Sequence, residues 1–185
     1  RNPSTVDMPE LAKLTRQHHL QVPAIGTGQA YSEDRLSFTD PDASIRKAAI
    51  GRLKSHIPWA ARFDAILIVG LLRGELKSGV KPAQAMDWLD EALRECCRAA
   101  YGEGVRLALE PINRYETTLI NTVDEGLELV DRLGEPNFGL LLDTFHMNIE
   151  EADIEESIQR GGEHIFHFHV ADSNRRHPGA GHLGF

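Results

Sequence analysis

Short apolar segments alternate with amphipathic segments along this chain, and that alternation most constrains the fold. Five segments are predicted as buried strands: Leu20–Gly26, Asp64–Gly70, Val105–Glu110, Phe138–Asp143 and His164–Val170. Between them, apolar residues recur at helical spacing, as Ala49, Leu53 and Ile57 do. Such alternation predicts a parallel sheet whose strands are connected by crossover helices.

Helix boundaries are marked by capping residues and prolines. Thr122 and Glu125 form a capping-box pattern before a short predicted helix that ends at Leu133. A longer helix is predicted from Pro82 to about Tyr101, and another over Ile154–Arg160. Pro58 is expected to kink or end the helix that carries the apolar stripe, because proline lacks the N–H that an interior helical position donates.

Two architectures fit this order of elements, an open doubly wound sheet and a closed eight-stranded barrel. The glycine fingerprint of a dinucleotide-binding sheet is absent, since the sequence offers only the weak G-x-G of Gly26 and Gly28. The barrel typically needs about 250 residues. If the sheet belongs to a barrel, residues 1–185 form a single domain that is an incomplete (β/α)8 TIM barrel.

Composition excludes some partners. The formal net charge is −8, whereas nucleic-acid binding normally needs a basic face, so we expect no nucleic-acid partner. No apolar run reaches the length of a membrane span, so we expect no membrane partner. Cys96 and Cys97 are adjacent and poorly placed to bond with each other, which favours reduced thiols and a cytoplasmic location.

Three successive predicted strands end in a potential metal ligand: Glu110, Asp143 and His169. Side chains alternate between the two faces of a strand, and these three share one face. The opposite face carries bulky apolar residues that suit helix packing, namely Leu107, Leu109, Leu140, Leu142, Phe166 and Phe168. Because α/β folds bind ligands at the carboxyl ends of their strands, we expect a functional site there.

Two carboxylates and one imidazole suit Mn²⁺, Co²⁺ or Mg²⁺, and Zn²⁺ is a further alternative. Each residue also has a purely structural interpretation. Asp143 can cap the turn after its strand, Glu110 can be a solvated loop carboxylate, and His169 can be a core histidine. The repetition on consecutive strands favours the metal site, with Mn²⁺ as the first choice.

The same residues carry a family resemblance. The segments LALEPINRYE, LLDTFHMNIEE and HFHVADSNRRHPGAGH resemble the xylose isomerase-like barrel superfamily. Within it they are most similar to ketose 3-epimerases of the D-tagatose and D-psicose type and to related sugar phosphate isomerases. The segments TGQAYSEDRLSFTDPD and IVGLLRG extend the resemblance over most of the chain.

The resemblance implies a (β/α)8 barrel of which this chain supplies about strands three to seven. It implies that Glu110, Asp143 and His169 bind the metal and that Glu110 also transfers the C3 proton. Glu116, His146 and Arg175 match residues that contact the ketose oxygens. A second glutamate is expected on the eighth strand, after Phe185. The implied partner is a small sugar or sugar phosphate, bound by an isomerase that forms a homo-oligomer.

Three other functions remain open at this point. Aldose–ketose or hydroxypyruvate isomerisation would use the same metal and carboxylate to move a proton between C1 and C2. The apurinic-site endonuclease branch of the fold would need more histidines and a DNA-binding face, which the net charge of −8 disfavours. A non-catalytic sugar-binding remnant is the third.

Overall fold

The structure is a computed structural model that describes residues 2–185. Five parallel strands form one sheet in the order β1-β2-β3-β4-β5. The strands are β1 Ala24–Gly26, β2 Ile66–Val69, β3 Leu107–Leu109, β4 Phe138–Asp143 and β5 Ile165–His169. A doubly wound sheet reverses its strand order at a switch point, whereas here every strand lies beside the next one in sequence. The sheet is therefore an incomplete TIM barrel, as predicted.

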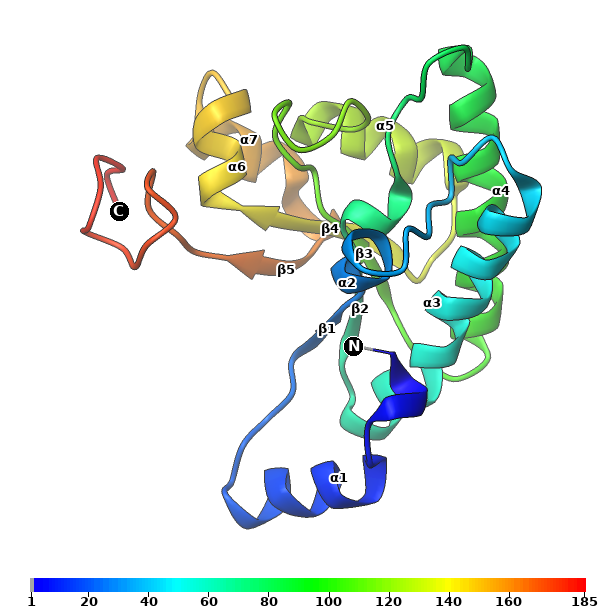
Figure 1. Cartoon of the computed structure of the whole chain (residues 1–185). Helices are drawn as coiled ribbons and strands as arrows, with labels where there is room; N and C mark the ends of the chain where they lie inside the picture. The colour runs from blue at the N-terminus through cyan, green and yellow to red at the C-terminus, as the bar shows by residue number, and fades with distance from the viewer. Residues whose placement is uncertain (1) are drawn as a thin grey trace.

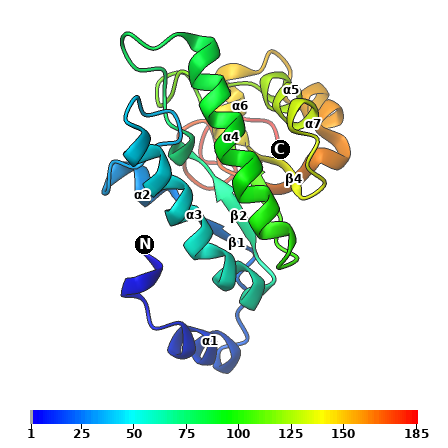
Figure 2. The same cartoon turned by 90° about the vertical axis from the view of Figure 1, so that its right-hand side faces the viewer.

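Helices fill the connections between strands (Figure 1). The α-helices are α1 Met8–Gln17, α2 Gly28–Ser32, α3 Ala43–Phe63, α4 Pro82–Tyr101, α5 Val123–Leu133, α6 Thr144–Glu150 and α7 Ile154–Gly161. Short 3-10 helices are η1 Pro3–Thr5, η2 Leu71–Arg73 and η3 Gly162–His164. Figure 2 shows α3 and α4 lying side by side across one face of the sheet.

Several of the predicted boundaries are confirmed, whereas every strand except β4 is shorter than predicted and one helix continues past its expected end. Helix α4 has the predicted bounds, and Thr122 and Glu125 make both hydrogen bonds of the capping box. The first strand is shorter than expected, because Pro23, which lacks an N–H, immediately precedes it. Pro58 was expected to kink or end its helix, and the second of these alternatives is wrong: α3 continues to Phe63. Pro58 is exposed there, so water can reach the carbonyl that it leaves unpaired.

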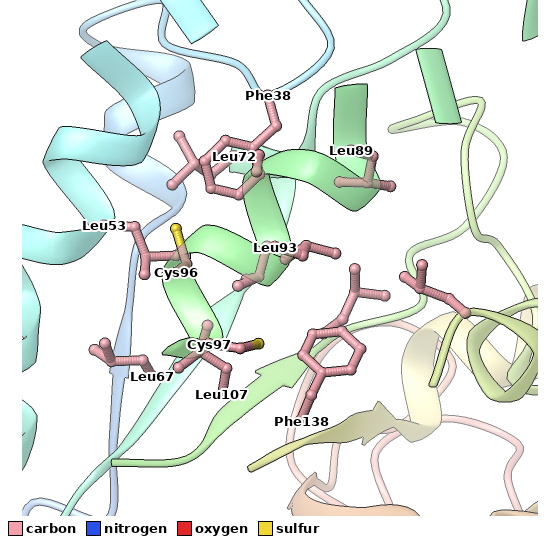
Figure 3. Packing of buried hydrophobic residues seen from close by; sticks show 14 of the residues in the cluster. Phe38, Leu53, Leu67, Leu72, Leu89, Leu93, Cys96, Cys97, Leu107 and Phe138 are labelled. Carbon is pink, nitrogen blue, oxygen red and sulfur yellow. The ribbon is translucent and has the colours of Figure 1, made fainter. Parts of the chain in front are cut away.

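The main core lies between the sheet and its helices (Figure 3). Leu67 and Leu107 of the sheet pack with Leu53 of α3 and Leu93 of α4, and all four are fully buried. Cys96 and Cys97 are free and buried in this core, and burial raises the pKa of the Cys97 thiol to about 12. None of the helices within residues 2–185 has the length and apolarity that a membrane span requires.

The other face of the sheet carries a smaller apolar cluster. Ile66, Ile68, Ala108 and Leu141 are buried there, with Ala24 and Phe166 packed against them. The prediction that Phe166 faces the helices is wrong. A register irregularity between Leu140 and Leu141, which pair with Ile165 and His167, leaves Phe166 as the extra residue of β5. This irregularity turns Phe166 to the inner face, while Phe168 packs against the main core.

Candidate active site

Three consecutive strands bring three potential ligands to one edge of the sheet. Glu110 directly follows β3, Asp143 ends β4, and His169 ends β5 in register with Asp143. One ligand atom from each residue lies within 4.8 Å of the others. The expected proximity on a shared face is therefore present, and a role in metal binding remains a prediction.

The backbone of Glu110 is held from two sides. Its N–H donates to the carbonyl of Val69 in β2 at 3.1 Å, and its own carbonyl accepts a hydrogen bond from the guanidinium of Arg73. A Cβ at Gly70 would lie 3.3 Å from Oε2 of Glu110, so the glycine leaves space for the carboxylate. The side chain of Glu110 is consequently mostly buried but reaches the open end of the sheet.

Arg73 supports this arrangement, although its sequence context gave little sign of such a role. It is fully buried in η2, and burial lowers the pKa of its guanidinium to about 10, so it remains charged at neutral pH. Glu110 and Glu125 are the carboxylates whose charges favour its protonated form. Nε and Nη2 of Arg73 have no hydrogen-bond partner within the described residues. In the sequence, Arg73 directly follows Leu71 and Leu72 within the segment IVGLLRG, which contributed to the family resemblance without a role for this arginine.

Carboxylates dominate the electrostatics around His169. Its Nδ1 lies 3.7 Å from Oε1 of Glu110 and 3.8 Å from Oδ2 of Asp143. The carboxylate of Glu110, more than that of Asp143, raises the pKa of His169. Burial raises the pKa of Asp143, although the N–H of Phe145 and the nearby imidazoles act in the opposite direction. The three groups thus favour binding a positive charge, either a proton or a cation.

This donor set fits a divalent cation. Metal–ligand bonds of about 2.0–2.3 Å place two ligand atoms at most about 4.6 Å apart. The ligand atoms of Glu110, Asp143 and His169 already lie within 4.8 Å of one another, so small side-chain shifts would close the site. These three residues offer two carboxylates and one imidazole, and no thiolate. Such a set of mainly oxygen ligands suits Mn²⁺, Co²⁺ or Mg²⁺.

The residues predicted to contact substrate lie next to this cluster. His146 of α6 is buried and places Nε2 3.8 Å from Oε1 of Glu110, and burial lowers the pKa of its imidazole. Arg175 donates from Nη1 to Oε1 of Glu116 at 2.8 Å and stacks its guanidinium 4.7 Å from the ring centroid of Phe145. The structure therefore groups all six predicted site residues at one end of the sheet.

Asp172 fixes the loop that carries Arg175. Its carboxylate accepts the N–H groups of Ser173, Gly179 and Leu183 at 2.7, 2.9 and 3.1 Å. Burial acts to raise the pKa of Asp172, but the combined backbone N–H donors hold it well below its usual range. Arg175 itself adopts a left-handed backbone conformation with φ of 62°. The loop is thus internally bonded around one carboxylate.

Curated proteins and solved structures resemble this chain. An L-ribulose 3-epimerase of Mesorhizobium japonicum is 42% identical and matches 100% of this chain and 61% of its own length. A D-psicose 3-epimerase of Agrobacterium fabrum is 44% identical over 80% of this chain and 52% of its own. A crystal structure of D-psicose 3-epimerase in the presence of D-fructose has a TM-score of 0.84 at 28% identity, covering 98% of this chain and 64% of that one.

The chain thus spans between about half and three fifths of the length of these curated relatives. The family model described as "Xylose isomerase-like TIM barrel" matches residues 1–185. That match agrees with the sequential order of the five parallel strands in the incomplete barrel. The chain belongs to the xylose isomerase-like TIM barrel family.

Proposed function

We propose that this chain carries the metal-binding and proton-transfer residues of a ketose 3-epimerase. The observation that supports it most is the convergence of Glu110, Asp143 and His169 at the carboxyl ends of three consecutive parallel strands. The relatives named above are described as 3-epimerases of ketoses, which favours the same reaction here. The substrate is a small ketose or its phosphate.

Glu110, Asp143 and His169 would hold the divalent cation, with Mn²⁺ as the first choice. When bound, the cation supplies positive charge that stabilises negative charge developing on the ketose oxygens, which contributes several kcal/mol to such reactions. The two carboxylates offset that positive charge, and the half-exposed ring of His169 leaves the site open on the inner side of the sheet.

Glu110 is proposed as the base that removes the proton from C3. One carboxylate oxygen faces the cluster, and the side chain is 13% exposed, so it can reach a substrate in the open end of the sheet. A positioned acid or base typically contributes about 10²–10⁴-fold to rate. Epimerisation also needs proton delivery to the opposite face of C3, and the family resemblance assigns that to a glutamate on the eighth strand.

His146 and Arg175 are proposed to bind the substrate oxygens. Both carry N–H donors close to Glu110 and Glu116, and donors placed where negative charge develops lower the barrier. Glu116 keeps Arg175 in place through the 2.8 Å ion pair and is available to accept a hydrogen bond from a sugar hydroxyl.

Substitution Glu110→Gln tests the proton-transfer role in the full-length protein with excess Mn²⁺. Glutamine keeps the size and one oxygen but is not a base, so exchange of the C3 hydrogen of the ketose with solvent deuterium should fall by about 10²-fold or more. Glu95→Gln, which alters only an exposed pair with Lys54, is the matched control and should retain full exchange. Near-normal exchange in Glu110→Gln would mean that another residue is the base.

Product analysis separates this proposal from aldose–ketose isomerisation. The unmodified protein, incubated with a panel of ketoses, should yield the C3 epimers. An aldose as the main product would instead indicate that the same site transfers a proton between C1 and C2.

A further inference from the structure

Asn113 lies at the centre of the side chains around the candidate site. It falls within the segment LALEPINRYE, but the resemblance assigned it no role. Asn113 lies in the loop after β3, and only 1% of its surface is exposed to solvent. Its Oδ1 accepts the backbone N–H of Tyr115 at 3.0 Å, and its Nδ2 donates to Oε1 of Glu116 at 3.2 Å. The same Nδ2 lies 2.7 Å from Nδ1 of His146.

These neighbours determine which way the amide of Asn113 points. A backbone N–H can only donate, so the Tyr115 side requires the amide oxygen. An ionised carboxylate can only accept, so the Glu116 side requires the NH₂ group. The flipped amide would set a donor against a donor and an acceptor against an acceptor. The hydrogen-bond network therefore selects the orientation in which the second amide hydrogen is directed at His146.

The orientation of the amide in turn decides the protonation of the imidazole. Nδ1 of His146 receives a hydrogen from Asn113 Nδ2, and the backbone N–H of Asn113 also points to it at 3.4 Å. Two donors facing Nδ1 require a lone pair there. In a neutral imidazole the hydrogen then resides on Nε2, which is the atom nearest Glu110, 3.8 Å from Oε1.

We infer that Asn113 is a positioning residue that holds His146 in its Nε2–H tautomer. His146 then presents a hydrogen-bond donor to the interior of the site. Such a donor suits a ketose oxygen that gains negative charge, whereas the other tautomer would present a lone pair to that oxygen and to Glu110. The identity of the acceptor as a ketose oxygen rests on the proposed function; the tautomer itself does not.

The constraint extends to Arg175. Oε1 of Glu116 accepts from both Nδ2 of Asn113 and Nη1 of Arg175, at 3.2 and 2.8 Å. The ion pair with Arg175 therefore holds the carboxylate of Glu116 in place, and that carboxylate keeps the amide of Asn113 oriented. His146 of α6 and Arg175 of the loop after β5, the residues expected to contact substrate, are thus connected through one amide and one carboxylate.

Nitrogen NMR of the full chain labelled with ¹⁵N-histidine tests the tautomer directly. The signals of His146 are assigned by their loss in His146→Gln. We expect Nδ1 to give the signal of an unprotonated ring nitrogen and Nε2 that of an N–H nitrogen. A protonated Nδ1 in the unmodified protein would overturn the inference.

Asn113→Asp tests whether Asn113 is the residue that holds His146 in this tautomer. An aspartate at this position can only accept, so we expect the hydrogen to move to Nδ1 of His146. Asn137→Asp is the matched control, because Asn137 is also a buried amide but donates to Cys97 and Val105 carbonyls far from the site. It should leave the His146 signals unchanged. An unchanged tautomer in folded Asn113→Asp would overturn the assignment to Asn113.

Kinetics separate a failure of this inference from a failure of the proposed function. If the protein epimerises a ketose, Asn113→Asp should lower kcat by about 10²–10³-fold, as loss of a donor to developing charge does, with a smaller change in KM. Unchanged kcat in a variant with a switched tautomer would contradict the donor role. If no ketose is a substrate of the unmodified protein, the proposed function fails, while the NMR result still decides the tautomer.

Discussion

One oxygen of the Asp143 carboxylate caps a helix, and the other faces the candidate metal site. Oδ1 accepts the N–H of Phe145 at 2.8 Å as the N-cap of α6, and Oδ2 lies 3.8 Å from Nδ1 of His169. The two interpretations that the sequence left open for this residue, a cap and a ligand, are therefore compatible. A substitution that keeps the cap and removes the charge can separate them.

Asp143→Asn is that substitution. Asparagine caps helices about as well as aspartate, so the free energy of unfolding without metal should fall by no more than about 1 kcal/mol. Loss of the charged ligand should weaken Mn²⁺ binding, measured by calorimetric titration, by at least about tenfold. Asp153→Asn is the control, because Asp153 caps α7 in the same way, accepting from Glu156 at 3.0 Å, at a distance from the site. Equal Mn²⁺ affinity in both variants would contradict a ligand role for Asp143.

For single residues, the sequence predicted correctly those positions that depend only on the local geometry of the chain. Alternation along a strand places Glu110, Asp143 and His169 on one face without knowledge of any distant contact. The roles of Asn113 and Arg73 depend on partners far away in sequence, such as His146, 33 positions from Asn113. No local spacing encodes such contacts, so only the folded arrangement identifies them.

At the scale of elements, β4 and β5 approach more closely than their sequences suggest. A Cβ at Gly139 would lie 2.6 Å from the carbonyl oxygen of His164 and 2.9 Å from the ring of Phe166. The glycine thus makes room for the irregular register that turns Phe166 to the inner face. Strict alternation of side chains could not predict that Phe166 lies on the inner face. One extra residue in β5 reverses which face of the sheet the preceding side chains point to.

Two glycine substitutions with opposite expected effects test this packing. Gly139→Ala should lower the free energy of unfolding by about 1–3 kcal/mol, because the backbone carbonyl that it meets cannot move aside cheaply. Gly51→Ala should raise it by about 0.5–1 kcal/mol, since Gly51 lies inside α3 and an added methyl group would meet nothing within 4 Å. Urea unfolding measures both. A neutral or stabilising Gly139→Ala would contradict the close approach.

Other elements show where local signals suffice and where packing overrides them. The capping box at Thr122 and the proline start at Pro82 act through neighbouring residues, so α5 and α4 begin where expected. Helices α2 and α6 were not predicted, because each is short and directly follows a strand. Helix α3 continues through Pro58 because Leu53, Ile57 and Ala60 on its buried face pack into the main core on both sides of the proline.

On the scale of the whole molecule, the sheet ends in two strands that differ as edges. Within residues 2–185, β1 and β5 each pair with one neighbour only. Strand β1 has three residues and follows Pro23, which has no N–H to offer another strand. Strand β5 has five residues and leads into Val170, which is 53% exposed. Strand β5 is thus the edge better suited to pairing with another chain.

We therefore predict that the 185-residue polypeptide, expressed by itself, self-associates through β5. The net charge of −8 opposes association at low ionic strength, so association should increase with salt as that repulsion is screened. Val170→Lys places a positive charge beside the β5 edge of each copy and should reduce association, because the like charges would meet when two β5 edges pair. Tyr101→Lys, at an exposed position at the end of α4, is the control. Sedimentation velocity over a range of concentrations measures the oligomeric state. A monomer at every protein and salt concentration would show that β5 does not associate. An equal effect of Val170→Lys and Tyr101→Lys would show that β5 is not the associating edge.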